Sequence, residues 1–202
     1  HGPMTDFYRL VYTILAPFIR FFFPRRVVGL ENLPEGGAIL CPNHASFWDP
    51  FVVAMALPVD SRLTVMAKDE LFHYPVVGWF LRKVGAFPVK RGGSDLAAMK
   101  TALRALGDGS RLLIFPEGTR VEEQGEAEAK GGAAVLSTRT KTPMIPVWCG
   151  PKHKLFRRTT VVFGAPYTPQ VAGRRATSEE SRQASEEILH RIYALSEVDG
   201  WK

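Results

Sequence analysis

Short apolar runs of strand length alternate along this chain with segments of helical periodicity, and this alternation constrains the fold more than any other feature. The apolar runs lie at 38–42, 63–67, 85–89, 112–116, 144–149 and 159–164. Helical patterns lie at 49–57, 76–84, 94–106, about 131–139 and 178–195. Because strands joined through helices run parallel in one sheet, the sequence predicts a single α/β domain with a largely parallel sheet flanked by helices.

Two of these helices carry residues that mark where they begin. Ser94 is placed as the N-cap of the helix at 94–106, because its hydroxyl can accept a hydrogen bond from the first turn. The apolar stripe of that helix is Leu96, Met99, Leu103 and Leu106. Thr177 and Glu180 have capping-box spacing at the start of the helix at 178–195.

The size and composition are those of one folded domain. A chain of 202 residues with 46% hydrophobic and 23% charged residues buries a core of ordinary size, which excludes a disordered tail and a coiled coil. Residues 1–3 are typical of a purification-tag remnant, so the expected divisions are 1–3, a segment at 4–27 and the domain at 28–202.

Cys41 and Cys149 lack the spacing of a disulfide framework or zinc site and fit a reducing, cytosolic environment.

An excess of basic residues gives the chain a formal net charge of +6 and a pI near 9.5. This favours anionic partners, and nucleic acid, a phospholipid surface and a phosphorylated small molecule are all compatible with it. The basic clusters at 152–158 and 174–175 are short and belong to no recognisable nucleic-acid-binding module. We therefore expect no nucleic acid partner.

The segment 4–27 has the pattern of an amphipathic helix at a membrane interface. Its apolar residues recur at helical spacing, but the run between Arg9 and Arg20 is too short to cross a bilayer, which takes about 20 apolar residues. The basic residues at 25–26 suit an anionic interface. A first helix packed on the protein's own core is the alternative. The density of phenylalanine exceeds what one buried stripe requires and favours the membrane surface.

A candidate catalytic pair lies in the sequence NHASFWDP at 43–50. His44 and Asp49 are five residues apart, which on a straight helix places them about 140° apart, so they can meet only if His44 precedes a helix that begins near Asp49. Pro50 supports this start, since proline is favoured in a first helical turn. Asp49 would then accept a hydrogen bond from one ring nitrogen and leave the other as a base. The alternative is a helix-capping Asp49 beside an incidental surface histidine.

Further polar residues follow other strands of the predicted sheet. The sequence FPEGTR at 115–120 places a carboxylate, open backbone amides and an arginine directly after an apolar run. Lys68, Lys90 and Arg91 follow two more runs. Taken alone, the segment at 115–120 could be a polar turn, and each of the basic residues could be a solvated surface charge. Together they place positive charge near His44, which suits a phosphate-bearing substrate.

Four segments together carry a family resemblance. NHASFWDP, MAKDELFHYPVVGWFLRKVGAFPVKR, FPEGTR and MIPVWCG occur in the order and spacing of the four blocks of the lysophosphatidic acid acyltransferase (1-acyl-glycerol-3-phosphate O-acyltransferase) family. The resemblance covers about 28–164. After Arg120 the chain departs from the family pattern, because no hydrophobic residue precedes Lys130, and no role is carried over to that lysine.

The resemblance implies a fold, a reaction and a place in the cell. The family moves a fatty acyl group from an acyl thioester, acyl-ACP or acyl-CoA, to the free sn-2 hydroxyl of 1-acyl-glycerol-3-phosphate, giving phosphatidic acid in phospholipid biosynthesis. It implies a peripheral or monotopic location on the cytoplasmic face of the cell membrane. The matched block residues are His44, Asp49, Gly85, Phe87, Arg91, Glu117, Gly118, Arg120, Ile145 and Pro146.

These residues suggest a direct transfer with no serine or cysteine nucleophile, no metal and no bound cofactor. His44 removes the proton of the acceptor hydroxyl, and Asp49 holds the imidazole. The expected phosphate-binding residues are Lys68, Arg91 and Arg120, and the expected substrate-positioning residues are Glu117 and Gly118. Glu117 either binds the acceptor or orients an arginine, and backbone amides near Gly118 or at the helix after Asp49 are candidate oxyanion donors.

Other functional classes are compatible with parts of this pattern. An acyltransferase for another lysolipid shares all of it, and a thioesterase could use the same histidine and aspartate with water as acceptor. A thioesterase, however, needs no cluster of cations beside the base. A non-catalytic membrane or nucleic-acid-binding protein would account for the charge alone.

Overall fold

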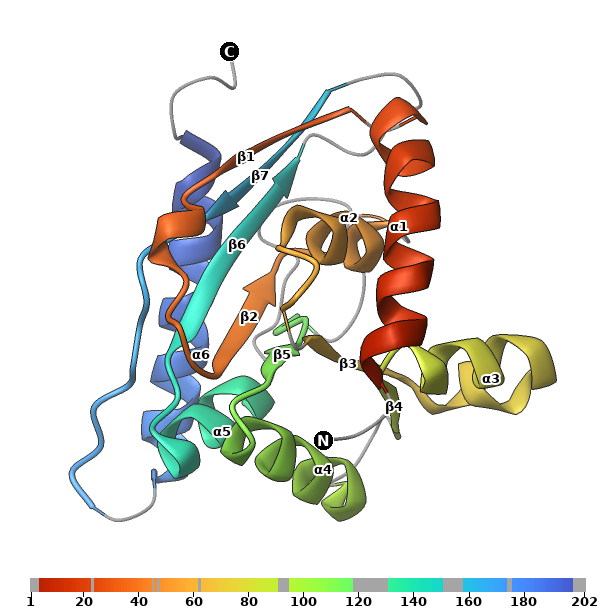
Figure 1. The fold of residues 1–202 in the computed structure, drawn as a ribbon. Coiled ribbons are helices and arrows are strands. Elements are labelled where there is room, and N and C mark those ends of the chain that lie inside the picture. The colour runs from red at the N-terminus through yellow and green to blue at the C-terminus, as the bar shows by residue number, and fades with distance from the viewer. Residues whose placement is uncertain are drawn as a thin grey trace.

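The structure, a computed structural model, describes residues 4–22, 24–44, 46, 48–61, 63–90, 95–117, 131–150, 158–173 and 176–197. At its centre is a seven-stranded sheet in the order β1-β7-β6-β2-β5-β3-β4 (Figure 1). The strands are β1 (Arg25–Val28), β2 (Ala38–Pro42), β3 (Leu63–Lys68), β4 (Ala86–Val89), β5 (Arg111–Leu113), β6 (Met144–Gly150) and β7 (Thr159–Phe163). All neighbouring strands pair in parallel except β6 and β7. The predicted α/β class and largely parallel sheet are confirmed.

The first strand of the sheet was not predicted. β1 pairs in parallel with β7, with Val27 opposite Val161. The expected boundary between 27 and 28 therefore falls inside a strand, and the sheet begins three residues before it. The sequence RRVV gives little strand signal, because it is short and half charged. Pairing with β7 and packing of Val27 against the core stabilise it.

Helices cover both faces of the sheet. They are α1 (Met4–Phe22), α2 (Asp49–Ala56), α3 (Pro75–Lys83), α4 (Leu96–Gly107), α5 (Gly132–Thr140) and α6 (Ser178–Ala194), with short 3-10 helices η1 (Leu30–Asn32), η2 (Asp69–His73) and η3 (Leu195–Glu197). Successive residues of a strand point to opposite faces. Ile39 and Cys41 of β2 accordingly pack with α4, α5 and α6, whereas Ala38 and Leu40 pack with α2. The central strand β2 is thus buried on both sides.

The predicted N-cap is confirmed for α6 and is wrong for α4. Thr177 and Glu180 form the predicted capping box of α6. The N-cap of α4 is Asp95 and not Ser94, which lies outside the described residues. The Asp95 carboxylate accepts from the N–H groups of residues 97 and 98. Of the predicted apolar stripe, Leu106 is buried and Met99 and Leu103 pack against the core. Leu96, the first residue of α4, is 70% exposed, and Ala98 and Ala102 complete the buried face.

The amino-terminal helix is attached to the same side of the sheet as α2. The Tyr12 hydroxyl lies 3.4 Å from the carbonyl oxygen of Met55 and 3.2 Å from that of Leu57, and the Arg25 guanidinium donates to the Met55 carbonyl. These carbonyls belong to the carboxyl end of α2, so α1 and β1 are fixed to the helix that begins at Asp49. No helix among the described residues is both long and apolar enough to cross a membrane.

Candidate active site

The loop after β2 is fixed to the neighbouring strand β6 by a buried asparagine. The side chain of Asn43 donates to the Cys149 carbonyl at 3.0 Å and accepts from the Cys149 N–H at 2.7 Å. The Asn43 N–H also donates to the carbonyl of Val147 at 3.3 Å. Because strands β2, β3, β4, β5 and β6 end at one edge of the sheet, these bonds place His44 at the edge where ligands bind in open α/β sheets.

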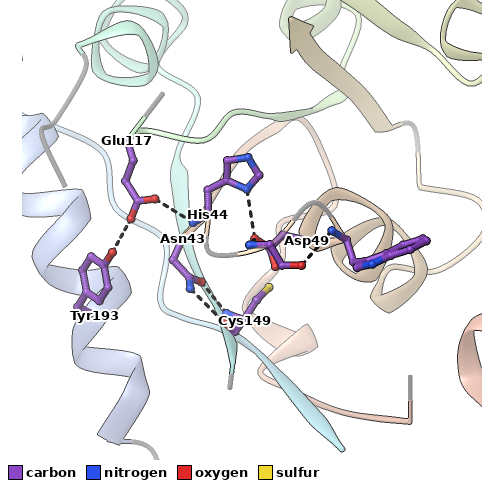
Figure 2. A network of polar contacts seen from close by, with 8 residues as sticks. Asn43, His44, Asp49, Glu117, Cys149 and Tyr193 are labelled. Atoms are coloured by element: carbon purple, nitrogen blue, oxygen red, sulfur yellow. Dashed lines mark hydrogen bonds and ion pairs between the residues drawn. The ribbon is translucent and has the colours of Figure 1, made fainter. Parts of the chain in front are cut away.

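His44 and Asp49 meet as the sequence predicts. The Nδ1 atom of His44 lies 3.2 Å from Oδ2 of Asp49, and the Ser46 N–H donates to the same oxygen at 2.7 Å. Asp49 is the first residue of α2 and is 1% exposed. Since a carboxylate only accepts hydrogen bonds, this contact favours the neutral tautomer that carries its proton on Nδ1 and leaves the lone pair on Nε2. Figure 2 shows this second nitrogen directed away from Asp49.

The surroundings hold this pair in one geometry. Pro50 lies in the first turn of α2, where its fixed φ angle is compatible with the helix. The amino-terminal end of the helix favours a negative charge on Asp49. The ring of Phe115 lies against the His44 ring, with centroids 4.1 Å apart and an interplanar angle of 34°. The imidazole is therefore confined by a carboxylate at one edge and an aromatic ring on its face.

Glu117 lies beside His44 but contacts its backbone. Its Oε2 accepts from the His44 N–H at 2.9 Å, and its Oε1 accepts from the Tyr193 hydroxyl at 2.6 Å (Figure 2). The side chain is 2% exposed. Burial raises the pKa of the Glu117 carboxyl, and both hydrogen bonds act in the opposite direction because they stabilise the carboxylate.

The structure shows two contacts of Glu117 that the sequence did not suggest. The sequence left two options, an acceptor contact or a contact to an arginine. In the structure one carboxylate oxygen accepts from the His44 N–H and the other from the Tyr193 hydroxyl. The two expected roles stay predictions. Glu117 thus supports the loop that carries the base. The spacing of motif residues does not show this, because the two partners of Glu117 lie far from it in sequence.

The expected phosphate site is only partly described. Lys68 ends β3 at the same edge of the sheet, and its Nζ forms an ion pair with Glu70 at 3.1 Å, which the sequence did not predict. Arg91, Gly118 and Arg120 lie outside the described residues. Their assignment therefore stays a prediction.

Two residues of the site were missed by sequence reasoning. Asn43 directly follows the apolar strand β2 and is buried. Because buried amides are hydrogen-bonded, a polar residue directly after such an apolar run is a signal that could have found it. Tyr193 gives no comparable signal. It follows the apolar face of α6 and looks like an ordinary packing residue.

Comparisons with known proteins show the family of this chain. A model of the acyltransferase family matches residues 24–150, more than half of the chain. The chain belongs to the acyltransferase family. It is similar to the 1-acyl-sn-glycerol-3-phosphate acyltransferase of Bacillus subtilis, with 29% identity over 176 residues, 84% of this chain and 87% of that protein. It is also 36% identical to the enzyme of that name from Streptococcus pneumoniae over 124 residues, which is 60% of this chain and 45% of that protein.

One solved structure has the same fold as this acyltransferase. The 1-acyl-sn-glycerophosphate (LPA) acyltransferase of Thermotoga maritima matches with a TM-score of 0.65 and 23% identity, covering 98% of this chain and 79% of that one. The likeness shows the fold alone.

Neither cysteine of this acyltransferase has the properties of a nucleophile. Burial raises the pKa of the Cys41 thiol, and burial together with the charge of Asp49 raises that of Cys149. Both side chains are buried. Because the thiolate is the reactive form, we expect both to stay protonated at neutral pH.

This environment predicts resistance to thiol reagents. Acyl transfer by the folded protein should be unchanged after treatment with N-ethylmaleimide, because both thiols are buried and burial raises the pKa of each. Activity assays before and after treatment, with mass spectrometry to count the labels, provide the measurement. Loss of activity in proportion to labelling of Cys149, prevented by the acyl thioester, would indicate a covalent acyl-enzyme.

Proposed function

We propose that the protein transfers an acyl group from an acyl thioester to the free sn-2 hydroxyl of 1-acyl-sn-glycerol-3-phosphate, giving phosphatidic acid for phospholipid biosynthesis. The main support is the geometry of His44, whose Nδ1 is held by Asp49 so that Nε2 is available as a base. The relatives from Bacillus subtilis and Streptococcus pneumoniae carry the name of this activity. The family match covers both residues.

The reaction is a direct attack of the acceptor on the donor. Nε2 of His44 takes the proton of the acceptor hydroxyl while its oxygen forms a bond to the thioester carbonyl carbon. The tetrahedral oxyanion then collapses, the carbon–sulfur bond breaks, and the imidazolium returns the proton to the leaving thiolate. Asp49 keeps Nδ1 protonated and stabilises the imidazolium. No step is assigned to a metal or a bound cofactor.

The proposed acceptor carries a phosphate that needs cationic partners. Arg91 and Arg120 suit this role, because a guanidinium binds phosphate through two parallel hydrogen bonds. Lys68 supplies a third charge once its ion pair with Glu70 opens. Backbone N–H groups at Gly118 or at the start of α2 are the proposed donors to the oxyanion.

The substrate assignment is tested with a panel of acceptors and donors. Detergent-solubilised protein is offered lysophosphatidic acid, monoacylglycerol and lysophosphatidylcholine, each with acyl-CoA and with acyl-ACP. We expect kcat/KM to be highest for lysophosphatidic acid by at least about tenfold, because only that acceptor presents an unsubstituted phosphate monoester. Preference for another lysolipid would reassign the acceptor.

We also propose that α1 and α3 bind a phospholipid surface on the cytoplasmic face of the cell membrane. The large exposed apolar side chains of α1 include Leu10, Ile14, Phe18, Phe21 and Phe22, and those of α3 are Val76, Val77 and Trp79. The rings of Phe7 and Trp79 meet edge to face at 5.5 Å, so the two apolar surfaces adjoin. Arg20, Arg82 and Lys83 lie in the last turns of these helices and suit anionic headgroups.

A substitution in this surface should weaken membrane binding without unfolding the protein. We expect the Phe18→Asp/Phe21→Asp variant to bind anionic liposomes at least about tenfold more weakly, because two aromatic side chains no longer leave water. The control is Leu96→Asp, which changes an equally exposed residue on α4 at the other face of the sheet. Cosedimentation with liposomes measures binding. Equal binding of all three proteins would contradict the proposed surface, and resistance to alkaline carbonate extraction would show integral insertion.

A further inference from the structure

A side chain from the last helix reaches the loop that carries the proposed base. The helix α6 packs on the face of the sheet opposite α2. The hydroxyl of Tyr193 donates to Oε1 of Glu117 at 2.6 Å, and Oε2 of Glu117 accepts from the His44 N–H at 2.9 Å (Figure 2). Tyr193 lies beyond residues 24–150, so the family match does not include it.

We propose that Tyr193 is a positioning residue for acyl transfer, acting through Glu117 on the peptide N–H of His44. The proposal rests on the function proposed above. It assigns the last helix a part in catalysis, in addition to its part in the core.

The buried carboxylate needs both of its partners to have one orientation. Rotation about the last side-chain bond of a glutamate is broad and has no sharp staggered minima. Glu117 is 2% exposed, so water does not supply a replacement for a lost hydrogen bond. With Tyr193 on one oxygen and His44 on the other, the plane of the carboxylate is fixed.

Tyr193 is itself held in place by the core. Its ring meets the ring of Trp148 on β6 edge to face, with centroids 5.5 Å apart. The preceding residue, Ile192, is fully buried. The hydroxyl is therefore positioned by packing before it meets Glu117, and the hydrogen bond transmits that position to the loop after β2.

The result is that His44 is held from both faces of the sheet. Asp49 of α2 fixes its ring, and Tyr193 of α6 fixes its backbone through Glu117. A displacement of about 1 Å at a reacting group can cost about a hundredfold in rate. Loss of the Tyr193 hydroxyl should therefore lower kcat more than it changes substrate binding.

A double-mutant cycle on the full chain tests this. The proteins are the wild type, Tyr193→Phe, Glu117→Ala and the double variant, each assayed for kcat, KM and thermal midpoint. We expect Tyr193→Phe to lower kcat about tenfold with KM within about twofold, and to have less than about a twofold effect in the Glu117→Ala background. The control is Tyr167→Phe, because Tyr167 contacts α6 through Arg191, whereas the Glu117 carboxylate accepts from His44 and Tyr193. It should retain the wild-type kcat.

Two outcomes would overturn the proposal. A Tyr193→Phe variant with wild-type kcat contradicts it, and so does a loss of equal size with and without Glu117, because Tyr193 would then act by another route. If Glu117→Ala does not fold, the backbone amide of His44 is followed by NMR in Tyr193→Phe alone. Its proton resonance should move upfield as the hydrogen bond to the carboxylate weakens, and no movement would refute the link. Absence of acyl transfer in the wild type would refute the proposed function instead.

Discussion

Replacing His44 with alanine should reduce acyl transfer by about 10²- to 10⁴-fold while the protein stays folded, because the general base is removed. Asp49→Asn should also cause a severe loss, somewhat smaller than that of His44→Ala. The asparagine amide no longer stabilises the imidazolium and can favour the wrong ring tautomer. The rate of phosphatidic acid formation measures the loss, and circular dichroism and the thermal midpoint verify the fold.

A second histidine provides the matched control. His73 lies on η2 and is largely exposed, with its Nε2 atom 3.6 Å from Oδ2 of Asp69. His73→Ala should therefore keep full activity. Near-normal turnover in a folded His44→Ala variant would show that another group is the base.

Substitution of the motif arginines should impair one acceptor selectively. If Arg91 and Arg120 bind the phosphate, alanine at either position removes charge-assisted hydrogen bonds worth about 1.5 to 3 kcal/mol. We expect kcat/KM for lysophosphatidic acid to fall at least about tenfold. The fall should be much smaller with monoacylglycerol, a slow acceptor that lacks the phosphate. Lysine should restore activity only in part, because it keeps the charge and loses the two-pronged geometry.

Comparison of the two acceptors separates this role from others. His44→Ala should suppress transfer to both, whereas Arg104→Ala, which changes an exposed arginine on α4, should affect neither. Equal losses for both acceptors in the Arg91 and Arg120 variants would mean that these residues support the fold or the thioester donor. The phosphate site would then have to be sought elsewhere.

Local features of this protein could be predicted from its sequence because they depend on neighbouring residues. The meeting of His44 with Asp49 follows from a five-residue spacing and the start of a helix. The capping box of α6 follows from Thr177 and Glu180 in the same way.

Features that depend on distant residues could not be predicted. The strand β1 exists because β7 pairs with it, about 130 residues further along the chain. Tyr193 is 76 residues from Glu117, and no spacing rule connects them. The link from Glu117 to the last helix therefore could not be predicted. The exposure of Leu96 has a local cause, since it is the first residue of α4 and lies at the end of the helix.

The central claim is that the thioester acyl group goes to a lysolipid hydroxyl and not to water. The most direct test measures, in one reaction, the thiol released from acyl-CoA or acyl-ACP and the phosphatidic acid formed. With lysophosphatidic acid present, we predict one phosphatidic acid for each thiol, and without it thiol release should fall to the level of His44→Ala. Equally fast thiol release without any lysolipid, with free fatty acid as the product, would contradict the account and identify a thioesterase.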